Sequence, residues 1–252
     1  MSATCLIGIL FAKQLFIKRV NMLFPSLKYG HLVYKKIDKS TYRDFKFNDH
    51  AAITWGEEVY GNWAEQYPYL IKSIDRRGAF ADYWRDHEPL SHYCGNTHYN
   101  ANNYYRSNGS GDDYFDSLKA VIIDIIDAAP RIPDNIVVYR ALVRIDFWDF
   151  KLLNGLRNPF VELGPMSTSL SASILTRKQD DLSSDFSACR YALKIFVPKG
   201  AKAVFVDVLA KHIANLDRGE IEILFPPESK LYMLSYPYKQ WGKTVIDCCL
   251  AL

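Results

Sequence analysis

The chain has 252 residues, 49% of them hydrophobic and 23% charged, which suits one large globular domain or two small ones. Its formal net charge is only +3 and it has no run of Lys or Arg, so we expect no nucleic-acid partner. The apolar run at residues 5–12 is too short to span a bilayer, so we expect no membrane partner either.

Cysteine usage indicates reduced thiols. The chain has five cysteines, an odd number, with no C-x-x-C pair, and Cys248 and Cys249 are adjacent. Neighbouring cysteines seldom bridge to each other, so we expect structural thiols in a reducing compartment. Neither the cysteines nor the six histidines show metal-ligand spacing, so we expect no metal site.

Residues 1–44 are expected to form a leader or delivery segment. Positive charge follows the apolar run at 5–12 instead of preceding it, and no clean cleavage site is visible, unlike a secretory signal peptide. Met22 is an alternative start. We expect the folded domain to cover residues 45–252.

The first half of this domain has helical periodicity. The strongest helix carries a single apolar stripe and begins near Asp112 and Asp113, whose charge favours a helix N-terminus. Pro130 ends it. We expect helices at 51–66, 69–84 (broken near Gly78), 99–106 and 112–129, a turn at 92–95 and a loop at 107–111.

The second half changes to strand periodicity. We expect strands at 135–142, 191–197, 203–208, 220–225, 230–236 and 244–252, a further strand that carries Ser167-Thr168-Ser169, and a short helix at 147–153. Helices followed by strands indicate an α+β domain. The helical lobe would cover about residues 45–130 and the β core about residues 131–252.

Glu220 and Glu222 are expected to share one face of a strand, because successive side chains point to opposite faces. Ile221 and Ile223 would then face the core. Two carboxylates on one face must be solvated, paired or used. Taken alone, such a pair on a strand is more often a solvated face than a catalytic pair.

Three motifs occur in order along the β half: Arg140 near the end of a strand, Ser167-Thr168-Ser169, and Glu220 with Glu222. This order resembles the Arg, Ser-Thr-Ser, Glu-x-Glu signature of the arginine-specific mono-ADP-ribosyltransferase toxins. The segment 185–200, with its Val-Pro-Lys-Gly turn, is similar to the aromatic-to-strand segment of that family. The resemblance covers about residues 45–252.

The helical half is similar to the actin-modifying branch of these toxins, the binary toxins of the iota type. Trp55-Gly56, Tyr60 and Trp63 match its opening helix, and the run from Tyr99 through Asn102 to Arg106 resembles its Tyr…Asn…Leu-Arg helix. The resemblance implies an N-terminal helical lobe packed on a two-sheet mixed β-sandwich. It also implies a secreted or injected monomer that acts on a host protein in the host cytoplasm, with actin the first guess.

The resemblance implies NAD as co-substrate and three catalytic residues. Breaking the nicotinamide–ribose bond develops positive charge on the ribose, which a fixed carboxylate stabilises most in the transition state. The family pattern assigns this role to Glu222, bonded to the ribose 2′-hydroxyl. Ser167 would hold Glu222 in position, and Glu220 would receive the acceptor guanidinium and help remove its proton.

The same resemblance implies a set of NAD-binding residues. Arg140 would clamp the pyrophosphate, which a guanidinium fork suits better than lysine, and Arg190 would add a phosphate contact. Phe186 would stack on or wall in the nicotinamide. The remaining members of the set are Ala141, through its backbone near the nicotinamide, Tyr60 near the adenosine, and Asn102.

Two other functions stay open: an NAD glycohydrolase with water as acceptor, and a catalytically inactive NAD-binding interaction module. A Rho-directed enzyme that modifies asparagine is disfavoured, because such relatives have Gln where this chain has Glu220. The chain departs from the binary toxins at Ala141, where they often have a second basic residue, and at residues 211–219, which lack their aromatic. It also has no room in residues 1–44 for their duplicated N-terminal domain.

Overall fold

The computed structural model describes residues 36–73, 83–107, 109, 111–142, 159–177, 186–213, 216, 219–235 and 237–252. All structural statements below concern these residues. Most of the expected leader, the break near Gly78 and the helix expected at 147–153 lie outside them.

The helices lie mainly in the first half of the chain, as the periodicity predicts. The α-helices are α2 (Asp49–Ala64), α3 (Tyr67–Ser73), α4 (Tyr83–Asp86), α5 (Pro89–His92), α6 (His98–Arg106) and α7 (Asp113–Ala128). Local capping explains where the two longest begin. The Asn48 side chain accepts a hydrogen bond from the amide of Ala51 at 3.0 Å, and Asp112 caps α7 through the amides of Tyr114 and Phe115.

The strands lie in the second half. They are β1 (Ile136–Leu142), β2 (Phe160–Glu162), β3 (Met166–Ser169), β4 (Tyr191–Val197), β5 (Val204–Phe205), β6 (Glu222–Phe225), β7 (Ser229–Met233), β8 (Tyr238–Gln240) and β9 (Lys243–Leu250). The expected α+β class is therefore confirmed.

The described strands form one mixed sheet in the order β2-β7-β9-β4-β1-β3-β6-β5, with β8 beside β9. β4 and β9 are parallel, and the other described pairs are antiparallel. One residue pair, Tyr139 with Ser169, joins β1 to β3. The family resemblance led us to expect two sheets. In the structure, the single pair between β1 and β3 connects the strands into one hydrogen-bonded sheet.

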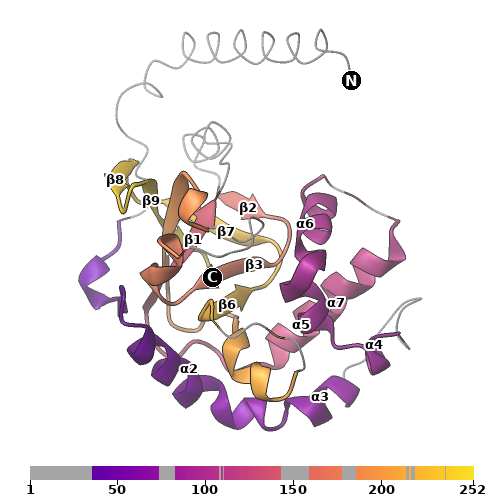
Figure 1. Ribbon diagram of the computed structural model, residues 1–252. Coiled ribbons are helices and arrows are strands. Elements are labelled where there is room, and N and C mark those ends of the chain that lie inside the picture. Colours follow the sequence, from indigo (N-terminus) through magenta and orange to yellow (C-terminus); the bar gives the residue numbers. More distant parts are fainter. Residues whose placement is uncertain are drawn as a thin grey trace, which may run out of the picture.

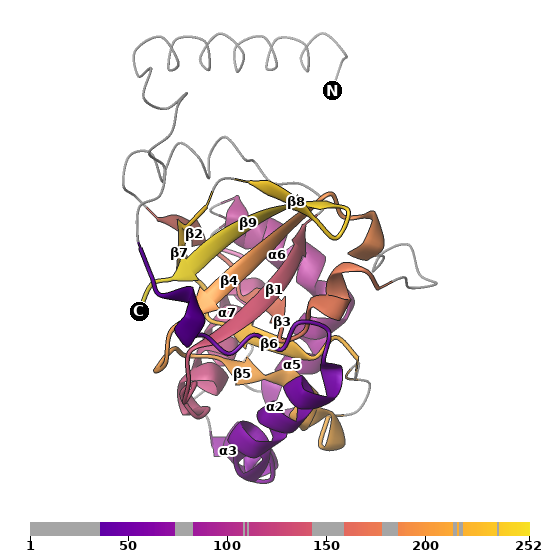
Figure 2. The same cartoon turned by 90° about the vertical axis from the view of Figure 1, so that its left-hand side faces the viewer.

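The hydrophobic core has two parts. The larger part includes Trp55 of α2, Leu118 of α7 and Val138 of β1, and the smaller includes Val137 and Tyr139 of β1. Successive side chains of β1 point to opposite faces of the sheet, so β1 contributes residues to both parts of the core. Figure 1 shows α5, α6 and α7 together on one side of the sheet, with α2 and α3 curving beneath it. Figure 2 shows β9, β4 and β1 side by side, with α6 and α7 behind them.

Residues 39–44, which we assigned to the leader segment, bond to the β core. The amide of Val137 donates to the carbonyl of Arg43 at 3.0 Å, and Lys39 pairs with Asp247 of β9. Asp44 accepts hydrogen bonds from Tyr139 at 2.5 Å and Lys194 at 2.8 Å. Within the described residues, the packed unit therefore begins before residue 45.

Two local expectations differ from the structure, and one element was not predicted. The turn expected at 92–95 is a π-helical segment, Tyr93–Thr97, that is interrupted at Gly95. The strand expected at 203–208 ends at Phe205 and continues as a 3₁₀ helix, Val206–Lys211. The β8–β9 hairpin was not predicted, because Trp241 (φ 53°) takes a turn position with positive φ that Asn, Asp or Gly usually fills.

Candidate active site

The three sequence motifs meet on adjacent strands. β1 carries Arg140, β3 carries the Ser-Thr-Ser motif, and β6 begins at Glu222. Ser169 pairs with Tyr139 on one side and with Glu222 on the other. Because neighbouring strands lie about 4.8 Å apart, the motifs come together within about 10 Å although they are far apart in the chain.

Arg140 is held by a buried carboxylate. Its Nη1 lies 3.1 Å from Oε2 of Glu162, and the Arg140 side chain is 11% exposed. Arg106 of α6 donates to the same carboxylate through Nε at 2.9 Å and Nη2 at 3.0 Å. Burial alone would raise the pKa of Glu162, but the two guanidinium groups outweigh it and hold that pKa below its usual value. The charged carboxylate of Glu162 in β2 thus links Arg106 of the helical lobe to Arg140 of the sheet.

The Ser-Thr-Ser motif supports the acidic segment that follows on β6. Thr168 Oγ1 donates to the carbonyl of Ile223 at 2.8 Å, and Ser169 Oγ donates to the carbonyl of Glu220 at 2.6 Å. The strand register pairs Ser169 with Glu222, whereas the half-buried Ser167, expected to hold Glu222, is opposite Leu224. The motif therefore fixes the backbone around both carboxylates.

The acidic pair does not lie on a regular strand. β6 begins at Glu222, and Ile221 before it has φ 51°, in the left-handed region. This conformation is a genuine outlier for a β-branched residue and costs on the order of 1–3 kcal/mol. Ile221 is itself buried at 3% exposure. The expectation that Glu220 and Glu222 share one strand face is therefore wrong, because the strand geometry stops between them.

Two residues of the π-helical segment lie beside this group, and sequence reasoning missed them. The hydroxyl of Tyr93 donates to the carbonyl of Pro165 at 2.8 Å and lies 3.1 Å from Oδ1 of Asn102. Burial is the main cause of its raised pKa, and both Arg140 and Glu222 act on it. Burial and then Glu222 raise the pKa of Cys94 well above its usual value, so this thiol stays protonated at neutral pH.

Asn102, expected to bind NAD, is buried against this tyrosine. A Cβ placed at Gly164 would lie 2.3 Å from Asn102 Oδ1, so a larger residue at this position would displace the Asn102 side chain. In the structure, Asn102 thus joins α6 to the segment that carries the Ser-Thr-Ser motif.

Three other residues expected to bind NAD are Ala141, Phe186 and Arg190. Ala141 and Phe186 pack against the smaller core part, and Arg190 is exposed just before β4. Buried Lys243 fixes the segment around Phe186 by donating to three backbone carbonyls, including that of Phe186 at 2.8 Å. The strand register and the contacts of Tyr93 bring together Arg140, Asn102, Ser167, Glu220 and Glu222. NAD binding by Ala141, Phe186 and Arg190 stays a prediction.

Tyr60 lies in the core of the helical lobe. Its side chain is fully buried, with ring centroids 6.3 Å from Trp55, 6.5 Å from Trp63 and 6.4 Å from Phe205. A Cβ at Gly56 would lie 2.2 Å from the Phe205 ring, so this glycine lets α2 reach β5. The aromatic residues of the opening helix therefore have packing roles in this structure.

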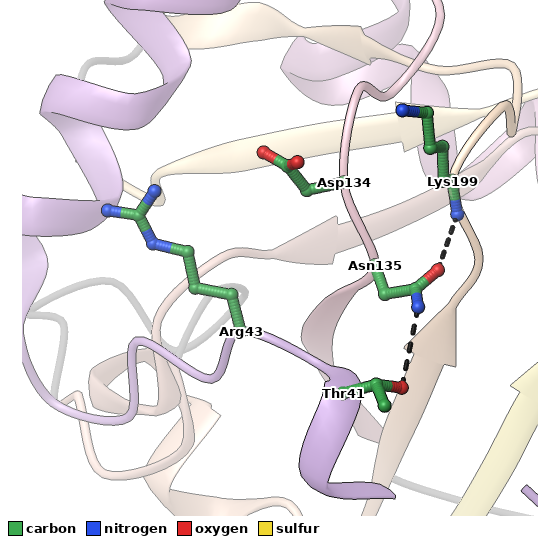
Figure 3. A pocket seen from close by; sticks show the side chains of 5 residues that line it. All are labelled: Thr41, Arg43, Asp134, Asn135 and Lys199. Carbon is green, nitrogen blue, oxygen red and sulfur yellow. Dashed lines mark hydrogen bonds between the residues drawn. The ribbon is translucent and has the colours of Figure 1, made fainter. Parts of the chain in front are cut away.

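A separate polar pocket lies at the other end of β1. Figure 3 shows its lining side chains, Thr41, Arg43, Asp134, Asn135 and Lys199. Asn135 accepts from the Lys199 amide at 2.9 Å and donates to Thr41 at 3.4 Å. Because Asn135 directly precedes β1 whereas Arg140 lies in its second half, this pocket is distinct from the group around Glu222.

Comparison with known proteins identifies the family. A model of the ADP-ribosyltransferase exoenzyme family matches residues 52–244, which include all three motifs. The chain belongs to this family. Transfer of ADP-ribose from NAD is therefore its chemistry, and NAD is its co-substrate. None of the curated proteins matches the chain by sequence.

Solved structures of ADP-ribosyltransferase toxins share the fold. Plx2a from Paenibacillus larvae has a TM-score of 0.60 and 19% identity over 83% of this chain and 100% of its own. C3stau2 from S. aureus, solved with NAD, has a TM-score of 0.58 and 18% identity over 83% and 98%. BECa from a C. perfringens binary enterotoxin, solved with NADH, has a TM-score of 0.56 and 18% identity over 83% of this chain and 50% of its own.

The residues at the site suit the chemistry of this exoenzyme family. The site holds two guanidinium groups, Arg106 and Arg140, on one buried carboxylate, and a further carboxylate, Glu222, at the start of β6. No group of three metal-ligating side chains occurs in the part of the chain that the structure describes. Within that part, Cys94, Cys189, Cys248 and Cys249 form no disulfide with one another. No helix in the described ranges is long and apolar enough to cross a membrane.

Proposed function

We propose that this ADP-ribosyltransferase transfers ADP-ribose from NAD to an arginine side chain of a host protein. The observation that supports this most is the pair of carboxylates on two sides of left-handed Ile221, beside the Ser-Thr-Ser strand and close to the paired guanidinium groups. This arrangement offers one acidic group for the NAD ribose and a second for the acceptor.

In the proposed reaction, the bond between ribose C1′ and the nicotinamide nitrogen breaks, and its electron pair leaves with nicotinamide. Glu222 stabilises the positive charge that develops on the ribose. A guanidine nitrogen of the acceptor arginine then forms the new bond to C1′, and its proton passes to Glu220. The products are the ADP-ribosylated arginine, nicotinamide and one proton.

Arginine is preferred to asparagine as the acceptor because of the charge at residue 220. A carboxylate at Glu220 attracts a guanidinium group and can accept its proton, whereas an amide at this position could do neither. If water instead of a guanidine nitrogen forms the new bond to C1′ and loses a proton, the products are ADP-ribose, nicotinamide and one proton, and the protein is an NAD glycohydrolase. An inactive NAD-binding module would release no nicotinamide at all.

Actin is the first candidate for the acceptor protein. The support for it is the resemblance of the opening helix to the actin-modifying branch. In the structure, Trp55, Tyr60 and Trp63 pack in the core, so this resemblance also has a packing explanation. We therefore test the acceptor residue and the acceptor protein separately. We also propose a secreted or injected protein that works as a monomer in the host cytoplasm.

The decisive experiment uses labelled NAD. The protein is incubated with labelled NAD and a eukaryotic lysate, the labelled band is identified by mass spectrometry, and purified monomeric actin is treated in parallel. A labelled arginine in any lysate protein supports the proposed activity, and one ADP-ribose on actin with loss of polymerisation supports the target. Unmodified actin beside another labelled protein would remove actin only. Nicotinamide release with no labelled protein would favour the glycohydrolase.

Arg140 is expected to contribute to NAD affinity. Replacing it with alanine removes charge-assisted hydrogen bonds worth about 1.5–3 kcal/mol, so the dissociation constant for NAD should rise roughly tenfold to a hundredfold. Arg140→Lys should restore only part of the affinity, because lysine lacks the planar fork. Calorimetry with folded variants measures both changes.

Arg43→Ala is the matched control for Arg140→Ala. Arg43 is an exposed arginine of the pocket at the opposite end of β1, and its loss should leave NAD affinity unchanged. If Arg43→Ala weakens NAD binding and Arg140→Ala does not, the co-substrate binds at the pocket in Figure 3 and the role of Arg140 is wrong.

A further inference from the structure

The backbone of residues 219–222 is held by side chains from three other segments of the chain. The carbonyl of Gly219 accepts a hydrogen bond from Nη1 of Arg177. Ser169 Oγ donates to the carbonyl of Glu220 at 2.6 Å. The next two amides are bound by Asp207, in the 3₁₀ helix Val206–Lys211. This degree of fixation indicates that the conformation of the segment is imposed from outside it.

Asp207 binds two consecutive amides with one carboxylate. Its Oδ2 accepts from the amide of Ile221 at 3.2 Å, and its Oδ1 accepts from the amide of Glu222 at 2.8 Å. Along a regular strand, successive amides point to opposite edges, so one carboxylate could not reach both. The contact is possible because Ile221 leaves strand geometry, with φ 51°.

This conformation opposes the local preference of the sequence. An isoleucine favours extended backbone and rarely takes positive φ. Without an outside contact, the segment would relax toward a continuous strand, and Glu220 and Glu222 would turn to the same face. The bidentate contact with Asp207 fits the left-handed alternative at this residue and does not fit a regular strand.

We propose that Asp207 is a positioning residue that sets the relative orientation of Glu220 and Glu222 by holding Ile221 in the left-handed conformation. This role rests on the proposed function, in which the two carboxylates act on different groups. Asp207 touches the backbone of the acidic segment, and it acts on the reaction through Glu222. Its removal should therefore change the rate of nicotinamide release more than the affinity for NAD.

The test compares Asp207→Ala, Ile221→Gly and the double variant. A small misplacement of a catalytic group can cost up to about a hundredfold, so we expect Asp207→Ala to lower kcat for nicotinamide release about tenfold to a hundredfold. KM for NAD should change little. Glycine takes positive φ without the cost that isoleucine has, so Ile221→Gly in the Asp207→Ala background should restore a large part of kcat.

Rescue separates positioning from simple stability. A second destabilising substitution would lower the melting temperature further, and it would restore kcat only if the conformation at residue 221 limits the rate. Asp127→Asn is the matched control and should leave kcat unchanged, because Asp127 is an exposed aspartate of α7 that pairs with Lys202. If Asp207→Ala does not fold, Asp207→Asn keeps one acceptor oxygen and should show faster hydrogen exchange at the amides of Ile221 and Glu222.

Two results would overturn the role of Asp207. The first is that the wild-type protein is active and that folded Asp207→Ala or Asp207→Asn has the same kcat as the wild type. The second is a double variant no faster than Asp207→Ala. A wild-type protein that neither releases nicotinamide nor modifies any protein would instead overturn the proposed function, and the positioning role with it.

Discussion

Glu222→Gln should lower the rate of nicotinamide release from NAD by about a hundredfold to a thousandfold, the usual effect of removing one electrostatic contact to a transition state. Glutamine keeps the size of the side chain and removes its charge. Because Glu222 acts on NAD itself, protein modification and NAD hydrolysis should fall together. Release of nicotinamide measured with and without an acceptor protein gives both rates.

The burial of Glu222 makes a folding control necessary. Glu222 is 9% exposed, and its amide is bound by Asp207, so the variant must first show a wild-type melting transition. Glu57→Gln is the matched control, because Glu57 is an exposed glutamate on α2. A folded Glu222→Gln protein that releases nicotinamide at the wild-type rate would show that another group stabilises the ribose.

Glu220→Gln should separate the two activities. Transfer to arginine should fall by about a hundredfold, because general acid–base catalysis commonly contributes that much or more. Hydrolysis of NAD should change far less, because water needs no carboxylate to bind a guanidinium group. Mass spectrometry of the acceptor measures transfer, and nicotinamide release without acceptor measures hydrolysis.

The structure makes the Glu220 variant informative. Ser169 donates to the backbone carbonyl of Glu220, and the exchange of the Glu220 carboxylate for an amide leaves this contact intact. Equal loss of both activities would mean that the side chain of Glu220 is structural, or that the two carboxylates have exchanged roles. Asn102→Asp is not a suitable comparison, because Asn102 is buried against Tyr93.

The acidic and basic halves of the site depend on different supports. Glu220 and Glu222 are placed by Ser169 and Asp207, within the β half of the chain. Arg140 is placed by Glu162, which also binds Arg106 of the helical lobe. A substitution at Glu162 should therefore act on NAD affinity, whereas one at Asp207 should act on kcat.

Much of the fold could be predicted because it depends on local periodicity. The apolar stripe of α7, its start beside Asp112 and Asp113 and its end before Pro130 appear in the structure as expected. β1 and β4 match their predicted ranges within one residue. In these elements the periodic spacing of apolar residues determines which side chains are buried. This spacing is visible in the sequence without knowledge of what packs against the element.

The sequence alone determined the order of the elements and the three motifs that the family model also covers. The tertiary structure decided how those motifs are held. Glu162 reaches Arg106 across 56 positions of the chain, and Asp207 bends a predicted strand at Ile221. Tyr93 and Cys94 come beside Arg140 and Glu222 only because the helical lobe packs on the sheet. These contacts join residues that are far apart in the chain and share no local sequence pattern. Together they outweigh the backbone preference of a single residue such as Ile221, so they are visible only in the folded chain.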